Sequence, residues 1–529
     1  MMKLGAIYGL VIFASAIFAQ TPTTRTAATP AAQTPATSTA ATPAARPSAQ
    51  IPAQALYKLD DAFLEWTLPP GRSAYAAIDG KRIHEYVADL TAISRRYRDQ
   101  GHPQFWGRII GTSADSETAQ WMVDKLKKSG LSDVHIQPFD LAPQWMPQSW
   151  EITAKAGEKT LKLDTSQPAY QTPSTSTAAT PAEGLDLEAV YAGTGSEADF
   201  AGRDVKGKAV FIFSMPLPGS WRHTATAEGA LRRAEAKGAA AIFAIIALPG
   251  NIRTQLYPTG TRVPTFSLGM DDGYAIRDLI GASSTPVHVK VKLDVKMVPD
   301  QKSGTVWATL PGMTDETVYV IAHRDGWFES GTDNASGVAT LVGLADYFSK
   351  IPKERRRRTI MFAGTTGHHN GANMSGTWLL DHRDEIFAKT ALLINCEHTS
   401  TIQTYLLGED IRHANMYTGM LWYAGGPRRP KLQDIAVKAF HDAGVVTYAT
   451  PERAAPGGEM SRLWPYVPGV QASDYNVYFH SDHEAAEMVP WTGLEAITRA
   501  YAMIIDGVNT LDLKDLQRPP EVTPGRGGR

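Results

Sequence analysis

Two neighbouring motifs in the second half of the chain decide the fold. Residues 318–327 read V-Y-V-I-A-H-R-D-G-W, and residues 331–337 read G-T-D-N-A-S-G. The apolar run before His323 predicts a buried strand, and the apolar spacing after Gly337 predicts a helix. A strand that ends on His323 and Asp325 presents both side chains at its carboxyl edge, where α/β proteins build their sites. We therefore expect the functional site at this edge.

Asp333 lies where the loop after this strand enters the helix. Its carboxylate could cap the helix N-terminus or bridge metal ions. Considered alone, Asp333 is better explained as a cap. The presence of His323 ten residues upstream, on a strand end, favours metal binding instead.

This strand, loop and helix together resemble the H-x-D and D-N-A-S-G signature of the co-catalytic zinc aminopeptidases. Residues 323–327, H-R-D-G-W, are similar to the H-R-D-S-W of glutamate carboxypeptidase II in the same family, which also includes the non-peptidase transferrin receptor. The resemblance extends roughly from Gly80 to Thr510. It implies an α/β fold, the mixed-sheet α/β/α sandwich of zinc exopeptidases (phosphorylase/hydrolase-like), with an inserted smaller β-rich protease-associated domain.

The resemblance also implies roles for the residues of both motifs. His323 would bind one zinc ion, Asp325 would orient that histidine from outside the ligand set, and Asp333 would bridge two metals.

Two later segments extend the resemblance. Residues 391–398 read A-L-L-I-N-C-E-H and resemble the family strand I-N-x-D, with Glu397 at the position of a metal-binding aspartate. Residues 477–483 read V-Y-F-H-S-D-H and resemble the Y-H-T-x-x-D sequence that supplies the final zinc histidine, here His480. His398 and His483 could also face the pocket, but each is better explained as an isolated surface histidine.

The chain departs from the family at a pair of glutamates, a general base followed by a zinc ligand. The aligned positions hold His368 and His369. Neutral imidazole is a good zinc ligand, so His369 can keep the ligand role. His368 could accept the proton of the attacking water, because its pKa of ~6.5 suits neutral pH, although adjacent zinc ions would oppose its becoming cationic. The predicted catalytic residues are His368 and Asp325, and the predicted metal ligands are His323, Asp333, His369, Glu397 and His480.

Charge counting bears on the number of metal ions. Two zinc ions bring four positive charges, and only Asp333 and Glu397 remain as anions at the aligned ligand positions. A single zinc ion, or another divalent metal that prefers histidine, is therefore easier to hold. Two hypotheses follow: an exported zinc-dependent exopeptidase acting on peptides, of aminopeptidase or carboxypeptidase type, or a catalytically impaired or inactive homologue that acts as a binding module. A serine hydrolase is disfavoured, since no G-x-S-x-G sequence joins a strand to a helix.

Composition shifts predict the organisation of the chain. Residues 205–213, with V-K-G-K before an apolar strand, and residues 227–246, a helix, K-G-A and a second strand, resemble a protease-associated domain. A Thr/Ala/Pro-rich segment near the start offers too little apolar surface to fold. The predicted segments are a signal peptide at 1–19, a disordered linker at 20–53, peptidase segments at 54–164 and 301–513, an insert at 165–300 and a disordered tail at 514–529.

Charge and cysteine content limit the partners and the compartment. Lys and Arg total 52 against 54 Asp and Glu, so the net charge of -2 does not point to nucleic acid. Cys396 is the only cysteine, which excludes an intrachain disulfide and a lipid-accepting cysteine at the signal's end. The apolar stretch from Leu4 to Phe18 is short for a bilayer span, so we expect export to the periplasm or outside the cell without a stable membrane anchor.

Overall fold

The computed structural model describes residues 66–170, 176–217, 222–257, 259–370, 374–407, 410–417, 429–445 and 458–517. The predicted signal peptide and linker lie outside these ranges, as does the tail from residue 518. Helix α13 (Leu513–Leu516) is helical where the sequence analysis placed the start of the tail. Within the described ranges, no helix combines the length and the apolar character that a membrane span requires.

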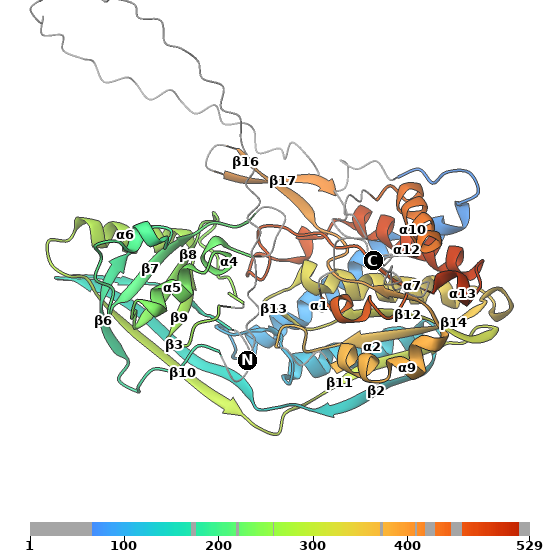
Figure 1. Cartoon of the computed structure of the whole chain (residues 1–529), viewed down its shortest axis with the longest axis horizontal. Helices are drawn as coiled ribbons and strands as arrows, with labels where there is room; N and C mark the ends of the chain where they lie inside the picture. Colours follow the sequence, from blue (N-terminus) through green and yellow to red (C-terminus); the bar gives the residue numbers. More distant parts are fainter. Residues whose placement is uncertain are drawn as a thin grey trace, which may run out of the picture. The chain divides into compact units, whose positions relative to one another are not determined.

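A six-stranded mixed sheet organises the half of the chain that carries the motifs (Figure 1). Its strand order is β18-β15-β12-β14-β11-β2. The four strands at one side, β18 to β14 in this order, run parallel, whereas β11 and β2 pair antiparallel. The predicted mixed α/β sheet is confirmed. The strand bounds are β2 (Ser132–Asp140), β11 (Lys302–Leu310), β12 (Thr314–His323), β14 (Arg358–Thr365), β15 (Thr390–Asn395) and β18 (Gly469–Gln471).

Helices cover both faces of this sheet. Successive side chains of a strand point to opposite sides, so β12 places apolar side chains on both faces. Val318 and Val320 of β12 belong to the main core, together with apolar residues of the helices α1, α2, α7 and α12. Tyr319 and Ile321 face a second cluster that contains residues of α8 and α11. The α/β/α layering expected from the sequence is therefore present. The helix bounds are α1 (Gly80–Asp99), α2 (Ser113–Lys128), α7 (Gly337–Ser349), α8 (Met374–Asp381), α11 (Met460–Leu463) and α12 (Trp491–Asn509).

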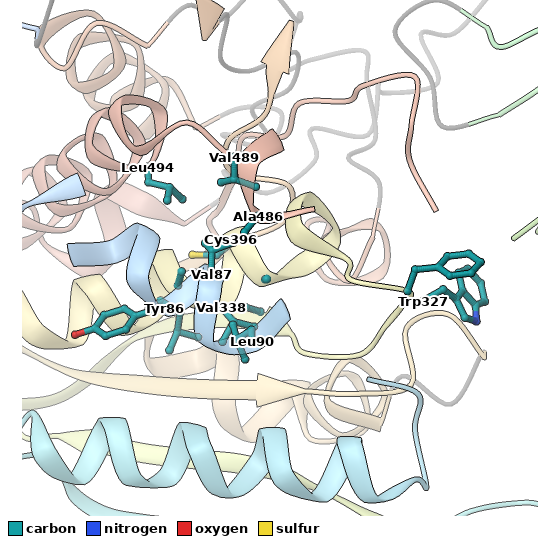
Figure 2. Close-up of a cluster of buried hydrophobic side chains, with 14 of the residues drawn as sticks. Tyr86, Val87, Leu90, Trp327, Val338, Cys396, Ala486, Val489 and Leu494 are labelled. Atoms are coloured by element: carbon teal, nitrogen blue, oxygen red, sulfur yellow. The ribbon is translucent and has the colours of Figure 1, made fainter. Parts of the chain in front are cut away.

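The main core lies directly against the segments that carry the motifs. Figure 2 shows Val87 and Leu90 of α1 beside Val338 of α7, all of them buried. Cys396, in the segment after β15, is buried in the same core. Burial raises the pKa of this thiol, so Cys396 acts as a small packed side chain.

The second sheet has eight strands in the order β4-β3-β10-β6-β7-β8-β9-β5. Its middle strands run parallel and alternate with helices such as α5 (Ala230–Ala236) and α6 (Met270–Ala282). It includes β3 and β4, which lie before residue 165, so this sheet begins earlier in the chain than the predicted insert. The bounds are β3 (Gln144–Ala156), β4 (Lys159–Lys162), β5 (Gln167–Pro168), β6 (Leu185–Tyr191), β7 (Ala209–Ser214), β8 (Ala241–Ile246), β9 (Thr265–Leu268) and β10 (His288–Val298).

A short backbone ladder joins this second unit to the segment that carries His480. The Gln255 amide donates to the carbonyl of His480 at 2.8 Å, and the Asp482 amide donates to the carbonyl of Arg253 at 3.0 Å. Thr254 and Ser481 form an antiparallel bridge between these bonds. The second unit therefore fixes the backbone on both sides of a predicted metal ligand.

His223 gives the second unit a measurable pH dependence. This residue precedes helix α4 (Thr224–Ala227) and is buried, and its Nδ1 has no hydrogen-bond partner among the described residues. Burial, helped by the charge of His480, lowers the pKa of His223 to about 4. The unfolded chain, with a histidine pKa of ~6.5, binds the proton more tightly, so stability is lost as the pH falls from about 6.5 towards 4.

The free energy of unfolding of the wild type should fall between pH 7 and pH 4.5. We expect this fall to be about 2 kcal/mol smaller in His223→Gln. Urea unfolding of both proteins at the two pH values measures this. His135→Gln, a change of a half-exposed histidine in β2, is the control. Equal losses of stability in wild type and His223→Gln would contradict the prediction.

Candidate metal centre

The ends of four parallel strands bring the predicted residues together. His323 at the end of β12 lies opposite Thr365, the last residue of β14. Asn395 at the end of β15 lies opposite Gln471 of β18. Because these strands are parallel and adjacent, the segments that follow them meet at one edge of the sheet. Those segments carry Asp325, Asp333, His368, His369, Glu397 and His480.

The Asp333 carboxylate is the centre of the arrangement, and four imidazole nitrogens surround it. His369 Nε2 and His480 Nε2 lie 2.9 and 2.8 Å from Asp333 Oδ2. His323 Nε2 and His398 Nε2 lie 3.1 and 3.3 Å from Asp333 Oδ1. All five side chains are buried. The structure therefore brings together three of the predicted ligands, His323, Asp333 and His480. A shared metal site requires this proximity.

The backbone at Asp333 presents its side chain at this point rather than capping the helix. Asp333 belongs to the turn η2 (Gly331–Ser336), which precedes α7, and its φ and ψ of -110° and 87° are not helical. The Asp333–Asn334 peptide bond is cis. Both Asp333 oxygens face imidazoles and no helix amide, so the capping role is not observed.

Asp325 orients two of the surrounding histidines. Its carboxylate accepts the backbone amide of His369 at 3.1 Å and lies 3.2 Å from Nδ1 of the same ring. Nδ1 of His323 lies 3.2 Å from the Asp325 carbonyl oxygen. Contacts at Nδ1 leave the two Nε2 atoms directed at Asp333, the arrangement that metal-binding histidines usually show. Asp325 therefore contacts the Nδ1 side of both rings.

Glu484 is a buried residue of the centre that sequence reasoning missed. Its two carboxylate oxygens accept the backbone amides of Asp333 at 2.5 Å and of His480 at 2.7 Å. Burial, followed by the charge of Asp333, raises the pKa of Glu484 well above its usual value. The only sequence signal was its position four residues after His480. Glu484 ties together the backbones of the two ligands from distant parts of the chain.

A second group of ligand-type side chains lies on the other side of His323. The structure brings His323, His368, Glu397 and Glu459 together, with one ligand atom of each within 4.8 Å of the others. His368 Nδ1 lies 3.3 Å from Glu459 Oε1, and His368 Nε2 lies 3.9 Å from Glu397 Oε1. The rings of His323 and His368 stack with their centroids 4.2 Å apart. Glu459 was not predicted from the sequence.

The chain approaches Glu397 so closely at position 458 that only glycine fits. A Cβ atom at Gly458 would overlap the Glu397 carboxylate, and Gly458 adopts a φ of +59°. Glu397 also accepts a hydrogen bond from the Asn395 side chain at 2.7 Å. Gly458 thus allows Glu459 to reach the same pocket as Glu397.

Neighbouring charges decide the protonation of the Asp333 group. Burial lowers the pKa of His369, but the Asp333 and Asp325 carboxylates outweigh it and raise that pKa to about 9. Burial dominates at His480 and lowers its pKa to about 4. Burial also opposes ionisation of Asp333, yet the surrounding histidines, His369 and His398 first, hold its pKa well below the usual range. The proton on His369 therefore supplies positive charge beside Asp333. A divalent cation would take the place of this proton.

The donor set fits zinc. Imidazole nitrogens and carboxylate oxygens are the ligands that zinc accepts, and three protein ligands with an open position are typical of catalytic zinc. Several buried ligand atoms make no hydrogen bond among the described residues, and these include Glu459 Oε2 as well as His323 Nε2 and Asp333 Oδ1, which lie 3.1 Å apart. Unsatisfied buried atoms of this kind are costly unless something else binds them.

The two remaining histidines differ in their surroundings. His398, expected on the surface, is instead buried beside Asp333, with its backbone amide bonded to the Asn334 side chain. His483 keeps 48% of its side chain exposed and contacts Asp482, which agrees with a surface histidine.

The fold and this centre define a metallopeptidase-type hydrolase. Residues 305–505 match the family model of Peptidase family M28.

Solved structures share the fold. The M28 peptidase precursor from Shewanella amazonensis superposes with a TM-score of 0.64 at 19% identity, covering 85% of this chain and 98% of its own. BSAP, a zinc aminopeptidase from Bacillus subtilis, superposes with a TM-score of 0.57 at 17% identity, covering 83% and 95%. The aminopeptidase from Aneurinibacillus sp. strain AM-1 gives 0.50 at 17% identity, covering 85% and 97%. At these identities the likeness shows the fold.

Proposed function

We propose that the protein is a zinc-dependent exopeptidase that removes single residues from the end of peptides. The observation that carries this proposal is the Asp333 carboxylate held between the Nε2 atoms of His369 and His480. These three side chains would hold zinc, with His323 beside the second oxygen of Asp333. Zinc at such a site supplies activation of a water molecule and polarisation of the scissile carbonyl group.

The residues around this ligand set keep it in place. Asp325 holds the His369 ring, and Glu484 holds the backbones of Asp333 and His480. Replacement of the family's ligand glutamate by His369 keeps a donor atom but removes a charge. The site therefore retains metal binding in this proposal, despite the His368-His369 pair.

A cavity next to His369 supports an apolar terminal residue as substrate. Aromatic side chains from both units line the cavity together with His369 and Asp325. Its aromatic members are Phe105, Trp145, Tyr170 and Trp327. We propose the amino end as the end that is cleaved, because the carboxylates of the centre would attract a protonated α-amino group.

Peptide cleavage is the direct test. We expect purified protein with added zinc to release the amino-terminal residue from Leu- and Phe-initiated peptides, and a chelator to stop release reversibly. N-acetylated peptides should resist, and C-amidated peptides should be cleaved. His480→Ala should lower kcat/KM by at least about 100-fold, because one of three ligands is lost.

His483→Ala, three residues from His480 and about half exposed, is the matched control. Cleavage of N-acetylated but not C-amidated peptides would assign the carboxyl end instead. Tight peptide binding without turnover in the presence of zinc would reject the enzyme and favour the binding module.

Export is the remaining part of the proposal. The apolar stretch at residues 4–18 supports a signal peptide and a periplasmic or extracellular location. Fractionation of cells that express the full chain tests this. Recovery of the protein in the cytoplasm with residues 1–19 still attached would contradict export. The resemblance of the second unit to a protease-associated domain stays a prediction.

A further inference from the structure

We propose that Asp115 is a positioning residue of the metal centre, although it lies in the first turn of helix α2, far along the chain from every proposed ligand. Through Arg324 and Thr366 it holds the two strand ends from which His323 and His369 enter the centre. This inference rests on the proposed metallopeptidase function and adds to it a residue that acts from behind the ligands.

The Asp115 carboxylate is buried, and its two oxygens face different parts of the fold. Asp115 is 1% exposed. Its Oδ2 accepts the Gly111 amide at 3.0 Å and the Ser303 hydroxyl of β11. Its Oδ1 accepts the Thr366 hydroxyl at 3.2 Å and a close contact from Arg324 Nη1. A capping role, typical of an acidic residue at a helix start, accounts for the Gly111 contact but not for those of Oδ1.

Arg324 connects Asp115 to the end of β12. Its Nη1 also donates to the Asp115 carbonyl oxygen at 3.0 Å. Arg324 lies between His323 and Asp325 in the chain, and these two neighbours share one side, since His323 Nδ1 is 3.6 Å from Asp325 Oδ1. An Arg324 side chain anchored on α2 therefore limits the rotation of the backbone that presents His323 and Asp325.

Thr366 connects Asp115 to the end of β14. It is buried and lies two residues before His368. Its hydroxyl donates to the same Asp115 oxygen that Arg324 contacts. The Arg324 amide in turn donates to the Thr365 carbonyl oxygen at 2.9 Å. One carboxylate oxygen thus fixes the separation of two adjacent strand ends.

Asp325 joins the same two segments at the centre itself. Its carboxylate accepts the amides of His368 and His369 at 3.3 and 3.1 Å. The segments after β12 and β14 are therefore joined at two carboxylates, Asp325 among the ligands and Asp115 behind them. A shift at Asp115 would reach His369 through both strand ends.

Charge gives Asp115 a second effect on the centre. The Arg324 guanidinium is a buried cation next to His323 in the chain, and on its own it would oppose a metal cation bound there. Asp115 compensates this charge in an ion pair whose side chains are both 1% exposed. Removing the carboxylate charge leaves a buried guanidinium unpaired, which is strongly unfavourable.

Two substitutions separate the charge from the position. Asp115→Asn removes both, because an amide nitrogen cannot accept the bonds of a carboxylate oxygen. Thr366→Val keeps the ion pair and removes only the bond to β14. Calorimetry of apoprotein with zinc and a competing chelator, without peptide, measures the affinity. We expect it to fall at least about tenfold in Thr366→Val and further in Asp115→Asn, within the range for loss of an outer partner.

Ser303→Ala is the matched control, because it removes the other hydroxyl from the same carboxylate. The remaining contact of Ser303, 3.5 Å to Arg324 Nη2, is at the limit of a hydrogen bond. Both hydroxyl variants should lose similar stability in urea. Only Thr366→Val should lose zinc affinity and change the visible absorption of cobalt(II) bound in place of zinc. Its kcat should fall with KM unchanged, because the peptide pocket is untouched.

The outcomes separate this inference from the proposed function. Equal zinc affinities in Thr366→Val and Ser303→Ala, with both proteins folded by circular dichroism, would show that Asp115 serves stability alone and overturn the positioning role. If Asp115→Asn does not fold, this comparison decides. Wild type that binds zinc without cleaving peptides rejects the exopeptidase and leaves the comparison intact. Wild type that binds no zinc overturns both.

Discussion

Replacing Asp333 by asparagine is expected to remove zinc from the proposed catalytic position and to lower kcat/KM by at least about 10³-fold, or roughly 4 kcal/mol of transition-state stabilisation. The amide keeps the shape of the side chain but loses the charge that four imidazole nitrogens approach within 3.3 Å. Without that charge, His369 and His480 remain as neutral donors with no anion between them. Zinc analysis and peptide hydrolysis on the same preparation measure both effects.

Asp186→Asn, an exposed change in β6, controls for the loss of a carboxylate elsewhere. Retention of zinc and of more than about a tenth of the activity would show that Asp333 is not the central ligand.

Replacing Arg108 by methionine is expected to lower the free energy of unfolding by about 3 to 5 kcal/mol. The guanidinium group is buried and donates to the carbonyl oxygens of Arg324, Glu329 and Ser330 at 2.7 to 3.0 Å. Methionine fills similar space but leaves these oxygens without a donor, at about 1–3 kcal/mol for each buried group. Burial lowers the pKa of Arg108 to about 10, while Asp325, Glu484 and Asp333 oppose the shift, so the group stays charged at pH 7.

Urea unfolding at neutral pH measures the loss. Arg98→Met is the control, because Arg98 is paired with Asp99 at the surface, where an ion pair contributes less than about 1 kcal/mol. A loss of under about 1 kcal/mol for Arg108→Met would mean that water or a rearranged loop satisfies the three carbonyls. The same three carbonyls belong to the loop that carries Asp325, so a partial loss of zinc should accompany the destabilisation.

Local patterns and the family resemblance together were enough to predict the central strands and most of the side chains that gather around Asp333. The apolar runs before His323 and before Glu397 gave parallel strands, and adjacent parallel strands necessarily end at one edge. Once those strands are placed, His323 and Glu397 must lie near each other. Asp333, Glu397 and His480 were assigned to the site by the resemblance to the zinc aminopeptidases.

Residues that join the centre through tertiary contacts could not be predicted in this way. Glu459 precedes the short helix α11 and reaches the centre because Gly458 lets the chain pass against Glu397. Glu484 acts on backbone amides, which no side-chain motif reveals. His398 was expected at the surface because a lone histidine carries no signal about the side chain it faces.

The assignment of strands to the two sheets could not be predicted from the sequence either. Alternation of apolar and polar residues indicates a strand, but not which sheet the strand joins. β3 pairs with β10 over its length, and this long-range pairing places it in the second unit. Pairing between strands more than a hundred residues apart cannot be recognised from a short stretch of sequence.

The ladder between residues 253–255 and 480–482 means that the second unit is part of the metal centre's support rather than a detachable cover. Excising that unit, or exchanging it for the corresponding unit of a relative, would release one flank of the His480 backbone. Chimeras of this kind should therefore differ in how tightly they retain zinc before they differ in which peptides they accept. Natural variation in residues 253–255 would be a route to tune metal retention from a distance, with every ligand unchanged.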